Sequence, residues 1–178
     1  MDIQPWKKLK EDKVYHGYRS IIKRKFELPN GKVMEYDIVA GGNFASIAAL
    51  TEDNEVLLVK QFRPGPEQVL MSTPSGYIDF NEDPKDAAKR ELLEETGYQA
   101  EDIFFKKKVT LPYGIGCQYC FVATGCIEIQ GQRLDDTEFI EVITMNLPAF
   151  KEKLRNPHDF DFYNLTAAYL LLDHIQPF

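Results

Sequence analysis

Three glutamates, Glu91, Glu94 and Glu95, are spaced so that a helix would carry them on one face. Residues three and four apart are neighbours on a helix, because each residue is rotated by about 100° from the last. Three carboxylates in one patch repel one another, and a bound divalent cation relieves that repulsion. Hard cations such as Mg²⁺ bind carboxylate oxygens and keep waters and substrate phosphates as further ligands. The spacing predicts a divalent-metal site; the alternative is a solvated acidic face.

The residues on either side of the glutamates predict a short helix with defined ends. Asp83 is a favoured N-cap, and Pro84 suits the first helical position because its missing N–H needs no partner there. Gly97 can adopt the left-handed conformation that ends a helix. We therefore expect one helix between Asp83 and Gly97 to position the glutamates.

A glycine, a further glutamate and an arginine stand at fixed distances from this cluster. Five residues separate Gly76 from Glu82, and seven more precede Arg90, which is followed at once by the glutamates and then by Gly97. This pattern resembles the Nudix box, and every fixed position matches. Tyr98 departs mildly, since the family more often has an aliphatic residue there.

The resemblance implies hydrolysis of nucleoside diphosphates linked to a further group, with Mg²⁺ or Mn²⁺ as the cofactor. It implies that Glu91 and Glu95 are the main metal ligands, with Glu94 close by as a ligand or catalytic group. Arg90, counted among the catalytic residues, would form an ion pair with Glu82 that steadies the loop–helix–loop. The box positions expected to be structural are Gly76, Glu82 and Gly97.

The N-terminal part contains Asn30-Gly31 between two alternating runs, which predicts a β-hairpin from about residue 18 to 39. Residues 1–17 are expected to form a loose arm or a short helix. The chain is similar to the ADP-ribose pyrophosphatase subgroup of Nudix enzymes, where such strands exchange across a dimer; the alternative is a plain edge hairpin. The resemblance implies a homodimer in which Tyr18 and Phe26 stack on a base in the neighbouring subunit, with local packing as the alternative.

Two strands are expected at residues 44–50 and 55–63, and the apolar run 56–59 is typical of a strand buried on both faces. The second strand resembles the one preceding the box in the same subgroup. That likeness makes Arg63 a candidate contact for the substrate diphosphate, or else a surface arginine that closes the strand. It also implies that the carbonyl of Ser75 is a metal ligand, although Ser72 replaces the glutamate usual in the subgroup.

An acidic loop is expected after the box, leading into a strand near residue 139. In the subgroup this loop supplies a carboxylate that activates water or helps to hold a metal. Glu138 is the closest match and Asp136 the next; the alternative is a polar turn. A strand is also expected at residues 103–110, and residues 163–174 predict an amphipathic or largely buried helix.

Composition limits the classes of partner. The chain has 178 residues and a formal net charge of −7, which argues against a nucleic-acid partner because duplex binding draws on a basic surface. No apolar run is long enough to span a bilayer, so we expect no membrane partner. Residues 1–8 lack the apolar core of a signal peptide, and the expected location is the cytoplasm.

The cysteines include the pair Cys117 and Cys120. A zinc site normally needs a fourth ligand, and the scattered histidines supply no obvious one. Because Cys120 lies in an apolar, strand-like run, we interpret it as a small core residue.

These observations predict an α/β fold of the α+β type, the Nudix fold, with a mixed sheet between helices and a small N-terminal β-hairpin extension. Residues 1–40 would form the arm and hairpin, and residues 41–178 the Nudix domain. The implied activity is cleavage of a nucleotide sugar, first of all ADP-ribose to AMP and ribose 5-phosphate. The alternatives are a nucleoside triphosphate or other nucleotide-sugar pyrophosphatase, and a non-catalytic nucleotide-sensing module.

Overall fold

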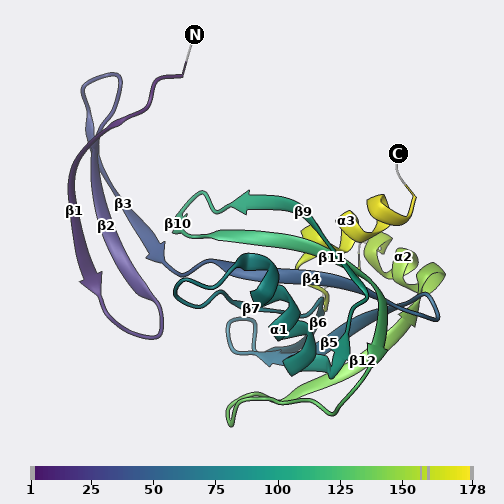
Figure 1. The fold of residues 1–178 in the computed structure, drawn as a ribbon. Helices are drawn as coiled ribbons and strands as arrows, with labels where there is room; N and C mark the ends of the chain where they lie inside the picture. Colours follow the sequence, from purple (N-terminus) through teal and green to yellow (C-terminus); the bar gives the residue numbers. More distant parts are fainter. Residues whose placement is uncertain (1–2, 157, 160, 177–178) are drawn as a thin grey trace. The chain divides into compact units, whose positions relative to one another are not determined.

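The computed structural model describes residues 3–156, 158–159 and 161–176 of the chain. The fold divides into two compact units (Figure 1). One comprises Met1–Asn43 with Thr110–Cys117, and the other Phe44–Val109 with Gln118–Phe178. No helix in the described part of the chain has the length and apolar character needed to cross a membrane.

The first unit is a four-stranded sheet in the order β1-β2-β3-β10. Its strands are β1 (Lys7–Tyr15), β2 (Ser20–Glu27), β3 (Val33–Ala40) and β10 (Gly114–Ile115). β2 and β3 form the hairpin predicted from Asn30-Gly31, and Gly31 takes the expected positive φ of 79°. β1 runs antiparallel to β2, and β10 runs parallel to β3.

The expectation of a loose arm or short helix was wrong for Lys7–Tyr15, which form β1. These residues pair with the edge of β2, and the guanidinium of Arg24 meets Glu11 across the strands at 2.7 Å. The polar, mixed-charge sequence of this segment carries no apolar alternation of its own. An unpaired strand edge offers a row of hydrogen-bonding groups, so the partner strand decides the structure here.

The two faces of this sheet differ in chemistry. Directly paired residues share a face, which places Phe26, Met34 and Tyr36 together. The rings of Trp6, Phe26 and Tyr36 lie with centroids 5.6–6.1 Å apart, and Tyr113 follows at 6.5 Å from Tyr36. The opposite face carries charged pairs, among them Lys23 with Asp37 and Lys25 with Glu35.

The second unit is built on an eight-stranded mixed sheet whose main path is β12-β5-β4-β11-β8. β4 and β11 are parallel, while β4 and β5 are antiparallel, as are β5 and β12. β6 pairs with β5, β7 with β4 and β9 with β11. The strands are β4 (Phe44–Thr51), β5 (Glu55–Arg63), β6 (Gln68–Ser72), β7 (Ser75–Tyr77), β8 (Tyr98–Gln99), β9 (Asp102–Thr110), β11 (Cys117–Glu128) and β12 (Ile140–Asn146).

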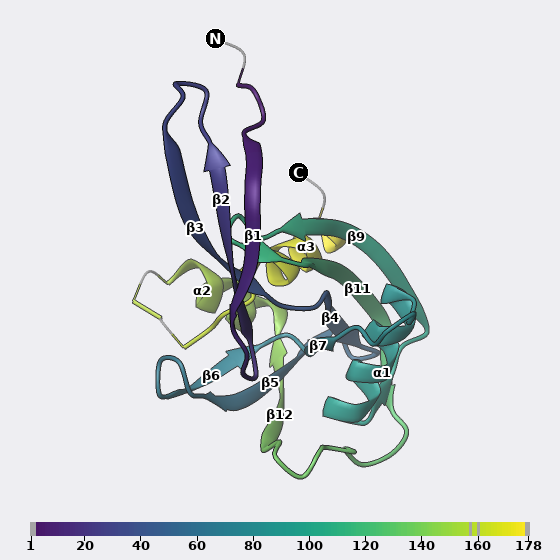
Figure 2. The same ribbon diagram turned by 90° about the vertical axis from the view of Figure 1, so that its left-hand side faces the viewer.

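Helices cover both faces of this sheet, as the predicted fold class requires. α1 (Pro84–Thr96) lies on one side of β4, and α2 (Leu147–Arg155) and α3 (Leu165–Ile175) on the other (Figure 2). Successive β4 side chains alternate between the two layers: Ile47 and Ala49 pack in the α1 layer, and Ala48 and Leu50 in the α2–α3 layer. The predicted mixed sheet between helices is therefore confirmed.

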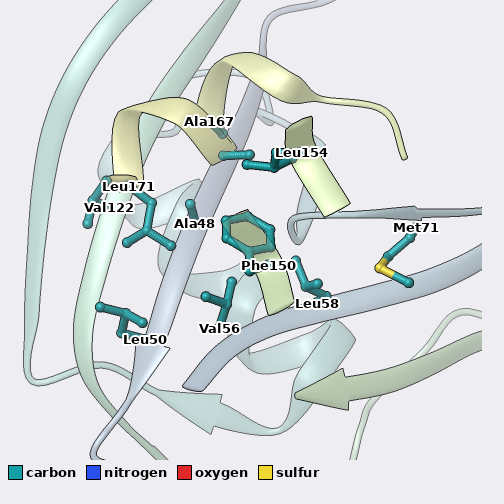
Figure 3. Packing of buried hydrophobic residues seen from close by; sticks show 11 residues of the cluster. Ala48, Leu50, Val56, Leu58, Met71, Val122, Phe150, Leu154, Ala167 and Leu171 are labelled. Carbon is teal, nitrogen blue, oxygen red and sulfur yellow. The ribbon is translucent and has the colours of Figure 1, made fainter. Parts of the chain in front are cut away.

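The layer below α2 and α3 has a buried aromatic side chain at its centre. Phe150 is fully buried and lies among aliphatic side chains from β4, β5 and both helices (Figure 3). α2, which carries it, was not expected from the sequence, because a helix of nine residues beginning at Leu147-Pro148 offers little periodic pattern. Its start is defined by Asn146, whose side chain accepts the Ala149 N–H at 2.9 Å.

The interpretation of Cys120 as a core residue is confirmed. Cys120 and Cys126 are buried in β11, and all three cysteines are free. Burial raises the pKa of the Cys120 thiol to about 11 and that of Cys126 to about 12, so both are held in the unreactive neutral form.

Candidate active site

Both ends of α1 form as the sequence predicts. The Asp83 side chain accepts the Lys85 N–H at 2.8 Å, and Pro84 occupies the first turn. At the other end Gly97 has a φ of 79° and donates its N–H to Leu93 at 2.8 Å. A Cβ at Gly97 would lie 2.1 Å from the carbonyl oxygen of Gln130, so close chain approach as well as the left-handed turn requires glycine.

Arg90 is the centre of an ionic network on this helix. Its Nε and Nη2 donate to the two oxygens of Glu82 at 2.9 and 3.0 Å, a bidentate pair. Nη2 also donates to the Tyr77 carbonyl at 2.9 Å, and Nη1 donates to Glu91 at 2.7 Å and to Glu94 at 3.0 Å. One guanidinium therefore ties the box loop to the carboxylate face of the helix. Hydrogen bonding to Arg90 lowers the pKa of Glu82, which stays charged.

The strand preceding the helix lies against the same carboxylates. A Cβ built on Gly76 would lie 2.1 Å from the Glu91 carboxyl carbon, so the absence of a side chain makes room for that carboxylate. The backbone N–H of Ser75 donates to Glu95 Oε2 at 2.9 Å. Glu95 is only 5% exposed, so this carboxylate is enclosed between the helix and β7.

Burial and crowding govern the ionisation of the carboxylates. Burial raises the pKa of Glu91, opposed by Arg90 and reinforced by the charges of Glu94 and Glu138. Burial raises the pKa of Glu95 to about 8, opposed by the Ser75 N–H and Arg63 and reinforced by Glu91 and Glu138. Five of the predicted site residues therefore interact electrostatically: Arg63, Glu91, Glu94, Glu95 and Glu138.

The loop that carries Glu138 is fastened to the C-terminal end of α1. Ile129 N–H donates to the Gly97 carbonyl at 3.0 Å, and Arg133 N–H to the Glu94 carbonyl at 2.9 Å. The Gln132 side-chain amide donates to the Glu95 carbonyl at 2.6 Å and to the Ile140 carbonyl at 3.1 Å. These bonds satisfy carbonyls that a helix end leaves without partners.

Sequence reasoning missed Gln132, because a side-chain amide that bonds only to backbone carbonyls leaves no motif. Within the loop, Glu138 accepts the Asp135 N–H at 3.2 Å. Asp136, the second candidate, is exposed.

Arg63, at the end of β5, is held by one tyrosine. Its Nη2 donates to the Tyr163 hydroxyl, and its guanidinium carbon lies 5.0 Å from the centre of the same ring. Its Nε is buried and has no hydrogen-bond partner among the described residues. Arg63 is therefore no freely solvated surface arginine, and it retains donor capacity for an anion.

The remaining two candidates belong to the first unit. Tyr18, between β1 and β2, is 93% exposed. Phe26 packs edge-to-face against Trp6 and Tyr36. Stacking of either ring on a nucleotide base stays a prediction.

The chemistry of the acidic donor set fits a hard divalent cation. All its side-chain donors are carboxylate oxygens, and burial with mutual repulsion disfavours their charge unless a cation is present. As they stand, no three His, Cys, Asp or Glu side chains in the described ranges are arranged around one ion position. Arg90 Nη1 donates hydrogen bonds to Glu91 and Glu94, so a cation would compete with this guanidinium for the two carboxylates.

Comparisons with known proteins agree with this geometry. Residues 43–166 match the family model described as the NUDIX domain. The chain is 32% identical over 151 residues to an ADP-ribose pyrophosphatase of Bacillus subtilis, covering 82% of this chain and 78% of that protein. It is 27% identical over 171 residues to a methanol dehydrogenase activator of Bacillus methanolicus, covering 93% and 91%. The crystal structure of an ADP compounds hydrolase superposes with a TM-score of 0.83 at 23% identity, covering 98% of this chain and 96% of that one, which shows a shared fold.

The contact between Gly76 and Glu91 predicts a variant that weakens cation binding without destabilising the fold. Gly76→Ala places a methyl group where the Glu91 carboxylate lies, and the end of that flexible side chain can move aside. We expect the melting temperature without metal to change little, and calorimetric Mg²⁺ affinity to fall about tenfold or more.

Gly65→Ala is the matched control, because a Cβ there meets open space and the backbone φ is not positive. Equal Mg²⁺ affinities of the two variants would contradict the placement of Glu91 in the cation site.

Proposed function

We propose, because the chain belongs to the Nudix family, that it hydrolyses the diphosphate of nucleoside diphosphate sugars. The first-choice substrate is ADP-ribose, cleaved with water to AMP and ribose 5-phosphate. The name of the Bacillus subtilis relative, ADP-ribose pyrophosphatase, supports this choice. All the glutamates of the box are present, which favours catalysis over nucleotide sensing alone.

The single observation that carries the proposal is the enclosure of Glu95. A solvated acidic face would leave this carboxylate in water, whereas Glu95 is buried against the Ser75 N–H beside Glu91 and Glu138. Burying an ionised carboxylate is costly unless an opposite charge compensates it. A divalent cation supplies that charge and is the family's cofactor; we propose Mg²⁺ or Mn²⁺.

The cation ligands we assign are Glu91 and Glu95, with Glu94 beside them and the backbone carbonyl oxygen of Ser75 as a further ligand. When bound, the cation neutralises the diphosphate, polarises phosphorus and lowers the pKa of ligated water. Arg90 keeps the box loop against the helix through Glu82 and Tyr77.

The remaining assigned roles concern the substrate and the attacking water. Arg63 binds a diphosphate oxygen with the donors that Tyr163 does not use. A carboxylate oxygen of Glu138 accepts the proton of the attacking water, and Asp136 is the alternative base on the same loop. Preorganised charges of this kind stabilise the negative charge that develops on the leaving phosphate.

A substrate panel tests the proposed function directly. Purified protein is assayed with ADP-ribose, other nucleotide sugars and nucleoside triphosphates, with Mg²⁺ and with excess chelator. We expect ADP-ribose to be the best substrate, chelation to abolish turnover, and Mg²⁺ or Mn²⁺ to restore it. Faster cleavage of triphosphates would support the rival pyrophosphatase, undiminished turnover in chelator would exclude the cation, and no turnover at all would favour a sensing module.

Glu95→Gln removes one charge while keeping the size of the side chain and an oxygen that can accept the Ser75 N–H. We expect turnover to fall roughly a hundredfold or more, because a charge that holds the cation at the phosphoryl transition state is lost. The melting temperature of the metal-free protein should stay the same or rise, since the cost of burying a charge and one repulsion within the cluster both disappear.

Glu52→Gln is the control, because Glu52 is an exposed turn residue of the same type. The assignment of Glu95 as a ligand fails if both variants keep near-normal turnover.

We further propose a homodimer formed through the N-terminal sheet, with residues 1–40 as the candidate for exchange. The support is the apolar face around Phe26, Met34 and Tyr36, since a single-layer sheet leaves such a face without a core of its own. Neighbouring β3 residues offer a matched pair: Met34 (47% exposed) lies on this face, and Val33 (46% exposed) lies on the charged face.

Light scattering at micromolar concentration should give twice the chain mass of 20.5 kDa. Met34→Glu should shift the protein toward monomer because it buries a charge in the contact, whereas Val33→Glu should not. A monomeric wild-type protein, or equal effects of the two variants, would refute this interface.

A further inference from the structure

The segment before α3, Asp161–Asn164, lies along β6 like a short additional strand. Met71 N–H donates to the Asp161 carbonyl at 2.6 Å, and Tyr163 N–H donates to the Met71 carbonyl at 3.0 Å. Between them Phe162 forms a parallel bridge with Met71, and its ring lies 6.0 Å from that of Phe150. This segment, called the strap below, is thus bonded to the sheet and anchored in the core on the α2–α3 side.

The side chain of Asn164, the last residue of the strap, bonds to other segments and does not cap α3. Its backbone is left-handed, with a φ of 65°, and its side chain makes no capping bond to α3. Its Nδ2 instead donates to the hydroxyls of Ser46 and Thr73, the latter at 3.0 Å, and its Oδ1 accepts Gln118 Nε2 at 2.5 Å. Ser46 and Thr73 are fully buried and lie 3.1 Å apart, so the amide links three segments through a satisfied polar network.

Thr73 connects this network to the acidic cluster. The Pro74 carbonyl accepts the Ile47 N–H at 3.0 Å, and the next residue, Ser75, donates its N–H to Glu95. Only Pro74 therefore separates Thr73, which Asn164 contacts, from Ser75, whose N–H bonds the buried carboxylate of Glu95. The hydrogen bond from Asn164 to the Thr73 hydroxyl therefore helps to fix the position of the turn from Thr73 to Ser75.

Tyr163, the strap residue before Asn164, contacts the candidate diphosphate-binding residue Arg63. Tyr163 accepts a hydrogen bond from Arg63 and places its ring beside the guanidinium. Arg63 ends β5, which pairs with β6, and β6 leads directly into the turn from Thr73 to Ser75. The strap is distant in sequence from both Thr73 and Arg63, yet it contacts both. Asn164 bonds Thr73, and Tyr163 bonds Arg63.

We infer that the strap positions the site: Asn164 sets the turn that meets the cation ligands, and Tyr163 aims Arg63 at the substrate diphosphate. Both are positioning residues, since they act through Thr73 and Arg63 and touch no reacting group. The inference rests on the proposed function and adds that cation affinity and substrate affinity are set by separate residues of one segment.

Asn164→Gly tests the metal side. Glycine keeps the left-handed backbone and removes only the amide. Mg²⁺ alone is titrated calorimetrically into the full-length protein, and we expect its affinity to fall about tenfold, as for loss of a group that orients metal ligands. Asn54→Gly is the control, because Asn54 is an exposed turn residue with a similar φ of 60°. Thr73→Val, which removes the hydroxyl at nearly constant volume, should weaken Mg²⁺ binding in the same direction and decides the point if the glycine variant does not fold.

Tyr163→Phe tests the substrate side. It keeps the ring beside Arg63 and loses the hydroxyl that accepts its hydrogen bond. We expect the KM for ADP-ribose to rise about fivefold, the order of one lost hydrogen bond, with kcat within about twofold and Mg²⁺ affinity unchanged. Tyr169→Phe is the control, because it removes a hydroxyl whose one partner among the described residues is the Leu154 carbonyl.

The outcomes separate the inference from the proposed function. If wild-type protein does not hydrolyse ADP-ribose, the proposed function is wrong, and the Mg²⁺ titration still reports on Asn164. If wild-type protein is active, Mg²⁺ affinity of Asn164→Gly and Thr73→Val equal to that of Asn54→Gly overturns the role of Asn164. A KM of Tyr163→Phe equal to that of Tyr169→Phe overturns the role of Tyr163.

Discussion

Repulsion among carboxylates on one helix face is the constraint on which the candidate site depends. Arg90 offsets part of it by binding Glu82, Glu91 and Glu94 at once, with a further bond to the Tyr77 carbonyl. Glu95 is held instead by a backbone N–H and lies buried, where its charge is least favourable. A positive charge bound beside Glu95 would therefore lower the cost of keeping that buried carboxylate ionised.

The end of α1 serves both the fold and the site. Gly97 ends the helix and lies close to Gln130. The loop that begins near Gln130 donates N–H groups to the last carbonyls of the helix. That same loop continues to Glu138, whose charge acts on Glu91 and Glu95. A structural requirement, the pairing of carbonyls at a helix end, thus brings the candidate base to the candidate metal ligands.

The sheet beneath the site buries both apolar and polar side chains. β4 packs aliphatic side chains into both layers, yet Ser46 on the same strand is fully buried and bonds to Thr73 and Asn164. Polar groups within a core stabilise only when all are paired, and here they also define the path of the turn before the box. The apolar layers give the unit its stability, and the polar network determines where its active-site turn lies.

The sequence by itself determined what depends on near neighbours: both ends of α1, the hairpin turn at Asn30-Gly31, the strands around residues 44–63 and the shared face of the glutamates. Caps, turn residues and apolar periodicity act within a few positions, so they can be recognised locally. Only the tertiary structure decided that Lys7–Tyr15 form a strand, that Glu95 is enclosed, and that Gln132, Tyr163 and Asn164 meet the site. Those outcomes depend on hydrogen bonds and burial between segments far apart in the chain, and such contacts leave no local pattern.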